Sequence, residues 1–309
     1  MTATRHTAIE GLRQDATQAD PVISVIVPVW NDAKRIGQCI EALKSQSLRS
    51  DLFEIIVVDN GSTDATSSVV TRYPDVVLLH EPRTGSYAAR NTGLARARGA
   101  YVAFTDSDCI PHANWLEHGL AALQGRADVG IVAGRVMFCE PTGPYDRACL
   151  NYERHLSMRQ EENARNGLAI TANWFSRKDL LLKNGGFDAA LRSGGDHELS
   201  RRISKTGLRT EYLPAAVVMH PPRTHVAEVA AKVRRVAGGR WASATGRFRL
   251  LKRVKMETSN LVRRSWTIAR AKNLSVYERV EVMALLLRLW MVSLAELLRL
   301  QFGGVPTRS

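Results

Sequence analysis

Two aspartates at the end of a predicted strand are the residues whose types and spacing most directly suggest chemistry. Tyr101 to Phe104 is a short apolar run typical of a buried strand, and Asp106 and Asp108 follow it. Alternate side chains of an extended chain point the same way, so the two carboxylates can lie on one side. Neighbouring carboxylates repel unless one is protonated or a cation lies between them, and their hard oxygens suit Mg²⁺ or Mn²⁺. The pair therefore predicts a metal site or, alternatively, a solvated acidic turn.

Alternating strands and helices are predicted to position this pair. Apolar runs at residues 22–29, 53–58 and 76–79 predict three strands before the one at Tyr101, and helical patterns separate them at residues 36–43, 63–73 and 86–97. Asn31 or Asp32 is the expected N-cap of the first helix. The alternation predicts a right-handed, largely parallel α/β sheet. Because ligands bind beyond the carboxyl ends of such strands, Asp59, at the end of the second strand, is expected near the same site.

Several function classes lose support from the absence of their motifs. The chain has no G-x-G-x-x-G after the first strand and no G-x-x-x-x-G-K-[ST], which argues against dinucleotide and P-loop sites. His197 begins an HEL sequence, but Arg201 stands where a zinc protease needs its second histidine. The four cysteines form no C-x-x-C pair, so neither a zinc site nor a disulfide framework is expected, and a reducing cytoplasm is favoured.

Charge is distributed unevenly along the 309 residues. Residues 226–309 hold 17 Lys and Arg against 5 Asp and Glu, a net charge of +12 out of +13 for the whole chain. We predict a disordered or loosely attached lead-in at residues 1–20, without a secretory signal, a main domain at 21–225 and a helical, basic extension at 226–309. A basic extension suggests a polyanionic partner, and a membrane surface is favoured over nucleic acid.

Five segments in order resemble the family 2 glycosyltransferases of the GT-A fold. They are ISVIVPVWN from Ile23, EIIVVDNGSTD from Glu54, GSYAARNTG from Gly85, AFTDSD from Ala103 and GGFDAALRSGGDHEL from Gly185. The resemblance covers about residues 21–225. It implies an α/β fold with a mostly parallel sheet flanked by helices, and an inverting enzyme that takes a sugar from a nucleotide-linked donor.

The resemblance also implies donor-binding residues. Asp59 would help to bind the nucleotide base, typically uracil, and Asn60 stands where many members have a second Asp, which leaves the base preference open. Pro28 and Asn31 belong to the first matching segment and are expected at the nucleotide-sugar, and Arg90 would contact the diphosphate or the ribose. The alternatives are a cap or turn for Asp59 and an ordinary helix-surface arginine for Arg90.

Metal and acceptor residues follow from the same resemblance. Asp106 and Asp108 would hold Mn²⁺ or Mg²⁺ against the diphosphate, with His220 as a third ligand or simply a residue at a strand end. Asp196 would be the general base, with Glu198 as the minor candidate because Gly195 replaces the family's Glu before Asp196. The expected acceptor-side residues are Asn173, Trp174 and Arg202; core packing is an equal alternative for Trp174, and Arg202 could instead pair with a neighbouring acid.

A long helical pattern runs from Val276 to Phe302 in the basic extension. Its charged residues, apart from Arg279, fall within an arc of roughly 80°, and the rest of its surface is apolar. Its longest charge-free run, Leu289 to Ala295, is far shorter than the ~18–20 residues of a membrane span. We therefore expect an amphipathic helix that lies on a membrane, packs on the main domain or joins a second copy.

The sequence predicts a metal-dependent inverting glycosyltransferase that uses a nucleotide-sugar donor, most simply a UDP-sugar. Its acceptor would be a glycan or a lipid-linked saccharide, and its location the cytoplasm or the inner face of the plasma membrane. The alternative is a catalytically silent protein that binds a sugar-nucleotide or a polyanion.

Overall fold

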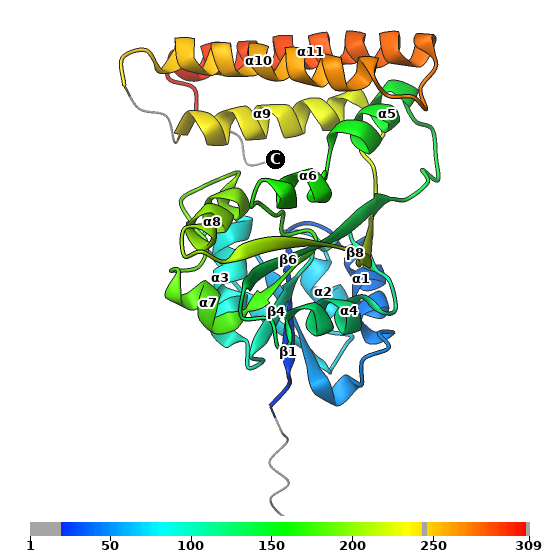
Figure 1. The fold of residues 1–309 in the computed structure, drawn as a ribbon, viewed down its shortest axis with the longest axis vertical. Helices are drawn as coiled ribbons and strands as arrows, with labels where there is room; N and C mark the ends of the chain where they lie inside the picture. The colour runs from blue at the N-terminus through cyan, green and yellow to red at the C-terminus, as the bar shows by residue number, and fades with distance from the viewer. Residues whose placement is uncertain (1–19, 243–245, 307–309) are drawn as a thin grey trace, which may run out of the picture.

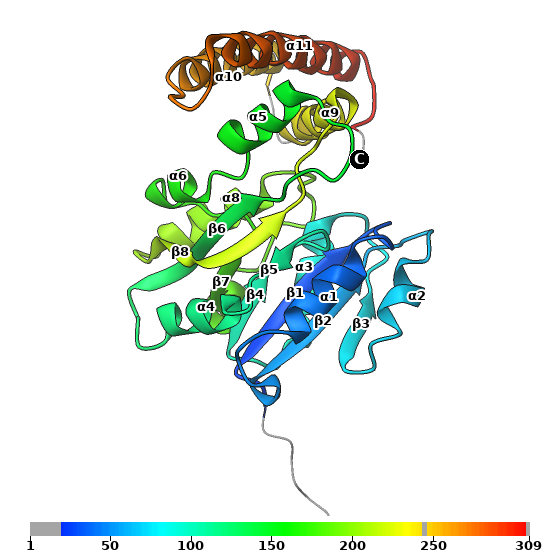
Figure 2. The same ribbon diagram turned by 90° about the vertical axis from the view of Figure 1, so that its right-hand side faces the viewer.

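The computed structural model describes residues 20–242 and 246–306, shown in Figures 1 and 2. The predicted lead-in at residues 1–20 lies outside this range except for Asp20. An eight-stranded sheet forms the centre of the molecule, in the order β3-β2-β1-β4-β7-β6-β8-β5. Its strands are β1 (Ile23–Val29), β2 (Phe53–Asp59), β3 (Val76–His80), β4 (Tyr101–Phe104), β5 (Ile110–Pro111), β6 (Val129–Phe138), β7 (Trp174–Arg177) and β8 (Arg209–His220).

As far as β4, the helices of the sheet region alternate with the strands in the predicted way. They are α1 (Ile36–Lys44), the 3-10 turn η2 (Ser50–Leu52), α2 (Thr66–Val70), α3 (Ser86–Arg96), α4 (Trp115–Leu123), α5 (Arg147–Leu156), α6 (Gln160–Arg165), α7 (Lys178–Lys183) and α8 (Gly195–Ser204). Two details differ from expectation. The helix α2 is shorter than predicted, and neither Asn31 nor Asp32 caps α1, because the helix begins at Ile36 without a side-chain cap.

The first half of the sheet is parallel, as predicted, and is buried on both faces. Strands β1, β2, β3 and β4 pair in parallel. Val25 and Val27 of β1 pack in one hydrophobic core, and Ile26 between them packs in a second core on the other side of the sheet. Burial on both faces explains why β1 reads as a continuous β-branched run rather than an alternating one.

The second half of the sheet is mixed. The strand β7 is antiparallel to β4 and to β6, whereas β6 and β8 are parallel partners along most of their length. This half was not predicted, because it joins strands far apart in the sequence that local periodicity cannot pair. It brings His220, the last residue of β8, beside the loop that follows β4.

The basic extension is helical, as expected, and forms a separate layer over the carboxyl ends of β1, β2 and β4 (Figures 1 and 2). Its helices are α9 (Val226–Ala242), α10 (Arg249–Ala269) and α11 (Val276–Gln301). Residues of α5, α9 and α11 share a third hydrophobic core. No helix in residues 20–242 and 246–306 combines the length and the hydropathy that a membrane crossing requires.

Within the charged arc of α11, the acidic residues are buried or half-buried, whereas Arg288 and Arg299 are exposed. Glu296 is buried and pairs with Arg299, while Glu281 pairs with Arg147 of α5 at 3.0 Å. Glu281 thus has its cationic partner on a neighbouring helix, whereas Glu296 has its partner within α11 itself. Apolar side chains are left on the outside of the helix.

Candidate active site

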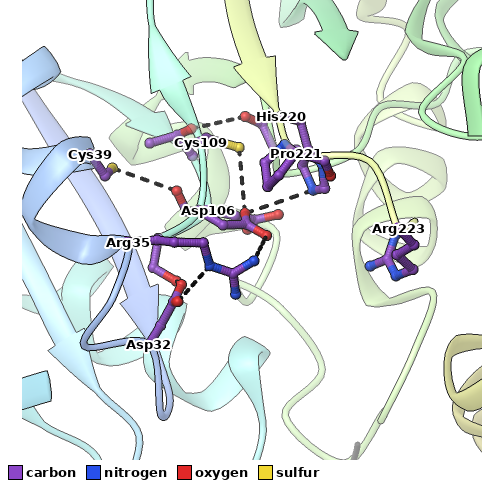
Figure 3. Close-up of polar contacts among 12 residues, drawn as sticks. Asp32, Arg35, Cys39, Asp106, Cys109, His220, Pro221 and Arg223 are labelled. Carbon is purple, nitrogen blue, oxygen red and sulfur yellow. Dashed lines mark hydrogen bonds and ion pairs between the residues drawn. The ribbon is translucent and has the colours of Figure 1, made fainter. Parts of the chain in front are cut away.

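The carboxyl edge of the sheet gathers the predicted strand-end residues. Asp59 ends β2, the aspartates follow β4, and His220 ends β8. His220 Nε2 lies 3.7 Å from Asp108 Oδ1. Arg35, just before α1, reaches the Asp108 carboxylate at 3.5 Å. It also donates from Nε to Asp32 at 2.6 Å (Figure 3). The site is therefore assembled from four segments of the chain: the loop after β1, the end of β2, the loop after β4 and the end of β8.

Asp108 and His220 present ligand atoms suited to a divalent cation. His220 Nδ1 lies 2.6 Å from the carbonyl oxygen of Pro221, and a carbonyl only accepts, so Nδ1 carries the proton. With the proton on Nδ1, Nε2 is the ring nitrogen that faces Asp108 and could ligate a metal. Cys109 Sγ belongs to the same cluster, whose ligand atoms lie within 4.8 Å of one another. Burial, followed by the charges of the two aspartates, raises the pKa of the Cys109 thiol well above its usual value, which disfavours thiolate ligation.

Asp106 has a different partner from Asp108. Arg90 of α3 donates from Nη2 to Asp106 Oδ1 at 2.5 Å. Arg90 is almost fully buried, and its Nε has no hydrogen-bond partner among the described residues. The carboxylate of Asp106 therefore lies outside the compact cluster of Asp108, Cys109 and His220, and a guanidinium with spare donor capacity stands beside it.

The expected base-binding residues hold the loops at the end of β2. Asp59 is buried, accepts from the backbone N–H of Ser62 at 2.9 Å and also accepts from the Ser67 hydroxyl. Asn60 donates to the carbonyls of Glu81 and Arg83 and accepts from the Gly85 N–H. These bonds fix the loop before α3.

The segment from Ile23 to Asn31 contains two of the expected donor-binding residues, Pro28 and Asn31. Pro28 is buried in β1, and Asn31 is exposed with a positive φ of 49°. Asn31 Oδ1 accepts from the Thr63 N–H at 2.7 Å. The turn after β1 is thereby tied to the turn after β2, at the edge where Asp59 lies.

Asp196 lies at the start of α8 in a half-buried position. Its Oδ1 accepts from the Tyr87 hydroxyl at 3.3 Å. A Cβ on Gly195 would come within 2.8 Å of the Tyr87 ring, and Gly194 has a positive φ of 79°. Glycine at these positions therefore lets the chain approach Tyr87, which accounts for the missing side chain before Asp196.

Glu198 and Arg202 pair with each other one turn further along α8. The guanidinium makes two contacts of 2.7 Å with the Glu198 carboxylate and also donates to the carbonyls of Asn184 and Gly186. Arg202 therefore fastens the loop before α8, and Glu198 is engaged in a bidentate ion pair.

Asn173 and Trp174 lie in the interior, which corrects their expected place in an acceptor pocket. Both are fully buried. Asn173 donates to two backbone carbonyls and accepts from Trp115 Nε1 at 2.9 Å. Trp174 packs in the second hydrophobic core. An amide that joins strands and an indole inside a core cannot line a surface for a sugar.

The helical layer adds charged residues that sequence reasoning did not identify. Fully buried Glu153 of α5 accepts from Arg223 at 3.0 Å and lies 3.5 Å from Lys232 of α9. Arg235, also on α9, has its pKa lowered by burial and by Arg223, while Tyr87, Asp106 and Asp196 oppose that shift. Arg235 makes no hydrogen bond or ion pair with the part of the chain that the structure describes. Only the clustering of arginine in this segment hinted at it.

The helix α9 packs closely against the loop before α8, which brings it near the candidate active site. A Cβ on Gly239 would lie 2.9 Å from Ser193 Cβ, in the loop that leads to Asp196. Arg235 lies four residues earlier and thus on the same face of the helix. This face of α9 is directed towards the carboxylates.

Sequence comparison assigns most of the main domain to one family. The profile described as Glycosyl transferase family 2 matches residues 24–185. Glycosyltransferase AglE of Haloferax volcanii is 37% identical over 213 residues, which cover 67% of this chain and 69% of that protein. The pre-mycofactocin glycosyltransferase of Mycobacterium tuberculosis is 32% identical over 66% of this chain, but only 43% of its own length is covered.

Solved structures share the fold at low sequence identity. The mannosyltransferase PcManGT of Pyrobaculum calidifontis, in complex with GDP-Man and Mn²⁺, aligns with a TM-score of 0.59 and 24% identity, over 92% of this chain and 86% of that one. Residues 1–349 of S. aureus TarS, in complex with UDP-GlcNAc, align with a TM-score of 0.53 and 19% identity, over 90% and 80% of the two chains. These likenesses show the GT-A architecture with a C-terminal helical region.

Proposed function

The chain belongs to glycosyl transferase family 2 and is a nucleotide-sugar glycosyltransferase, and on that premise we propose that it is an inverting, metal-dependent one. The observation that carries the proposal is the convergence of Asp108, His220 and the Arg90–Asp106 pair at the carboxyl edge of the sheet. Membership of an enzyme family decides against the catalytically silent alternative.

Asp108 and His220 would hold the divalent cation, Mn²⁺ or Mg²⁺, with Asp106 as a second carboxylate beside them. Carboxylate oxygens and a neutral imidazole are suitable donors for either ion. The mannosyltransferase that shares this fold was solved with Mn²⁺, which supports the assignment. When bound, such a cation offsets the negative charge that develops on the departing diphosphate.

The donor would lie along the edge formed by β1, β2 and α3. Asn31, Asp59 and Asn60 are fixed there by hydrogen bonds that join the turns after β1 and β2. We propose a UDP-sugar, with the base near Asp59 and the diphosphate near Arg90. Proteins of the same fold bind GDP-Man and UDP-GlcNAc, so a nucleotide diphosphate sugar is the common chemistry.

Asp196 is our candidate for the general base. Within the part of the chain that the structure describes, its carboxylate accepts only from the Tyr87 hydroxyl and from its own helix, whereas Glu198 is held by Arg202. In the proposed step the acceptor oxygen forms a bond to the anomeric carbon, the bond from that carbon to the diphosphate breaks, and Asp196 takes the hydroxyl proton. Attack from the face opposite the leaving group inverts the anomeric centre.

An open pocket beside His220 is our candidate for the acceptor site. It is lined by the end of β6, by α6 and by Tyr212, and it includes Phe138, whose ring lies edge-on to His220 at 5.9 Å. Polar and arginine side chains dominate its walls, which suits a hydroxylated or anionic acceptor. We propose a glycan or a lipid-linked saccharide, met by the enzyme at a membrane surface.

Removal of the metal-site carboxylate tests the proposal. We expect Asp108→Ala to abolish both hydrolysis and transfer of the donor sugar, and a chelator to do the same to the wild type until Mn²⁺ is restored. Asp179→Ala, which removes an exposed carboxylate that pairs with Lys183, is the matched control and should keep full activity. Full activity of the wild type in the presence of chelator would remove the metal from the mechanism.

A further inference from the structure

The outer face of α11 carries an apolar stripe that no part of the described chain covers. Its large members are 48–85% exposed and recur every three to four residues or at multiples of that spacing: Tyr277, Val280, Leu287, Met291, Leu298 and Phe302. The opposite face packs inward through Val282, Leu286 and Leu289. A helix that is apolar on both sides needs a second apolar environment.

The neighbouring helix α10 extends this apolar surface. Leu251, Val262 and Trp266 are 59–66% exposed. The guanidinium of Arg270 lies 4.0 Å from the centre of the Trp266 ring. A tryptophan stacked with arginine is amphipathic and suits the boundary between lipid and water. The two helices form the outermost layer at one end of the molecule (Figures 1 and 2).

Charges on these two helices are segregated. Every acidic side chain of α10 and α11 is buried or half-buried. Glu257 pairs with Arg240 and Glu281 with Arg147, both of which belong to other helices. The exposed charged residues from α10 to α11 are all cationic: Lys252, Lys255, Arg263, Arg270, Lys272, Arg288 and Arg299. The outer face is therefore apolar and positively charged at once.

An anionic lipid surface fits this combination better than a second copy of the chain. A dimer through this face would bring together two segments that each carry a net charge of +12. Juxtaposed like charges oppose association. Lipid headgroups with negative charge would attract the cations, and the acyl boundary would accept the apolar stripe.

We propose that the outer face of α10 and α11, the docking face, binds peripherally to anionic lipid bilayers. This proposal specifies how the enzyme would meet a membrane. The lipid binding itself is argued from the surface, and only its link to a lipid-linked acceptor rests on the proposed function. The carboxyl ends of β1, β2 and β4 point towards the same end of the molecule (Figure 2). Docking would thus turn the candidate active site towards the membrane, with α9 between them.

Vesicle sedimentation of the full chain tests the docking face. We expect binding to mixed phosphatidylglycerol–phosphatidylcholine vesicles, little binding to phosphatidylcholine alone, and weakening with salt. The triple variant K252Q/K255Q/R263Q should lose about 100-fold in partitioning, since each basic residue near an anionic surface contributes about fivefold. The matched control R72Q/R96Q/K205Q removes three exposed cations elsewhere and should bind as the wild type does.

An apolar variant and an activity assay separate the outcomes. L287S/M291S should weaken vesicle binding at both low and high salt, and a monomer by light scattering is expected throughout. Absence of binding to anionic vesicles, an equal loss in the control, or a dimer that L287S/M291S dissociates would overturn the proposal. Donor hydrolysis should be unchanged in these variants, so a failure of docking and a failure of the enzymatic assignment would be told apart.

Discussion

Asp196 and Glu198 are two residues apart, yet their surroundings suit different tasks. Asp196 faces the hydroxyl of Tyr87, whose own pKa is raised by burial and by the charge of Asp196, so Tyr87 stays a neutral donor. Glu198 has both oxygens on Arg202. A carboxylate in a bidentate pair is a weaker base than one with a free oxygen.

Substitution of the two acids should therefore give unequal results. We expect Asp196→Asn to lower kcat by about 10²–10⁴-fold with little change in the unfolding temperature, because a general base contributes that much. Glu198→Gln should act mainly on stability by loosening the loop that Arg202 holds. Steady-state transfer assays together with thermal unfolding measure both effects. Equal losses of kcat in the two variants would contradict the assignment.

Arg235 is a half-buried cation without a hydrogen-bond or ion-pair partner in the described chain. The charges of Asp106 and Asp196 nevertheless act on it and oppose the lowering of its pKa by burial. We expect Arg235→Gln to raise the KM for the nucleotide-sugar about 10- to 100-fold, the loss that follows from removing one charge-assisted hydrogen bond to a phosphate. The unfolding temperature should stay the same or rise, because an unpaired charge no longer needs to be desolvated.

The adjacent Arg234 offers the matched control for this variant. It is exposed, lies about 100° further round α9, and Arg234→Gln makes the same change in net charge. Its KM should equal that of the wild type. Similar KM values for both variants would mean that Arg235 does not meet the donor.

At the scale of elements, α9 connects the helical layer with the catalytic edge. Gly239 allows it to lie against the loop before α8, and Lys232 and Arg223 surround the buried Glu153. Burial and the nearby Arg223 lower the pKa of Lys232 to about 8, with Glu153 opposing them. The usual value for lysine is 10.5.

This shift predicts a stability that rises with pH. Between about pH 8 and 10.5 the unfolded chain still binds the Lys232 proton while the folded chain has released it, so the free energy of unfolding increases by up to about 1.4 kcal/mol per pH unit. Urea unfolding at several pH values should show this slope in the wild type. It should be lost in Lys232→Met and kept in the exposed-site control Lys255→Met. If the free energy of unfolding changed with pH in the same way in the wild type and in Lys232→Met, the role of Lys232 in this slope would be refuted.

At the scale of the whole molecule, the sheet and the helical layer have complementary roles. The sheet brings Asp59, Asp108 and His220 to one edge, and the layer above that edge supplies cations on its inner side and an apolar, basic surface on its outer side. One end of the molecule thus combines the candidate chemistry with the candidate docking face. That arrangement suits an acceptor that is attached to lipid.

The sequence by itself determined the parts that depend on local pattern. Continuous apolar runs are typical of strands buried on both faces, so β1, β2 and β4 were placed within a residue or two. The acidic residues after β4 and the segment around Asp196 were found because each motif is contiguous in the sequence and can be recognised without the fold. The excess of arginine after residue 225 likewise indicated a cationic helical segment.

Only the tertiary structure decided which side of each element meets another. Asn173 and Trp174 were expected at an acceptor and are buried, because β7 lies in the middle of the sheet between β4 and β6. Glu281 of α11 faces inward, where it pairs with Arg147 of α5, and Arg235 faces the site because α9 packs through Gly239. Such choices depend on contacts between residues distant in the chain, and periodicity carries no information about them.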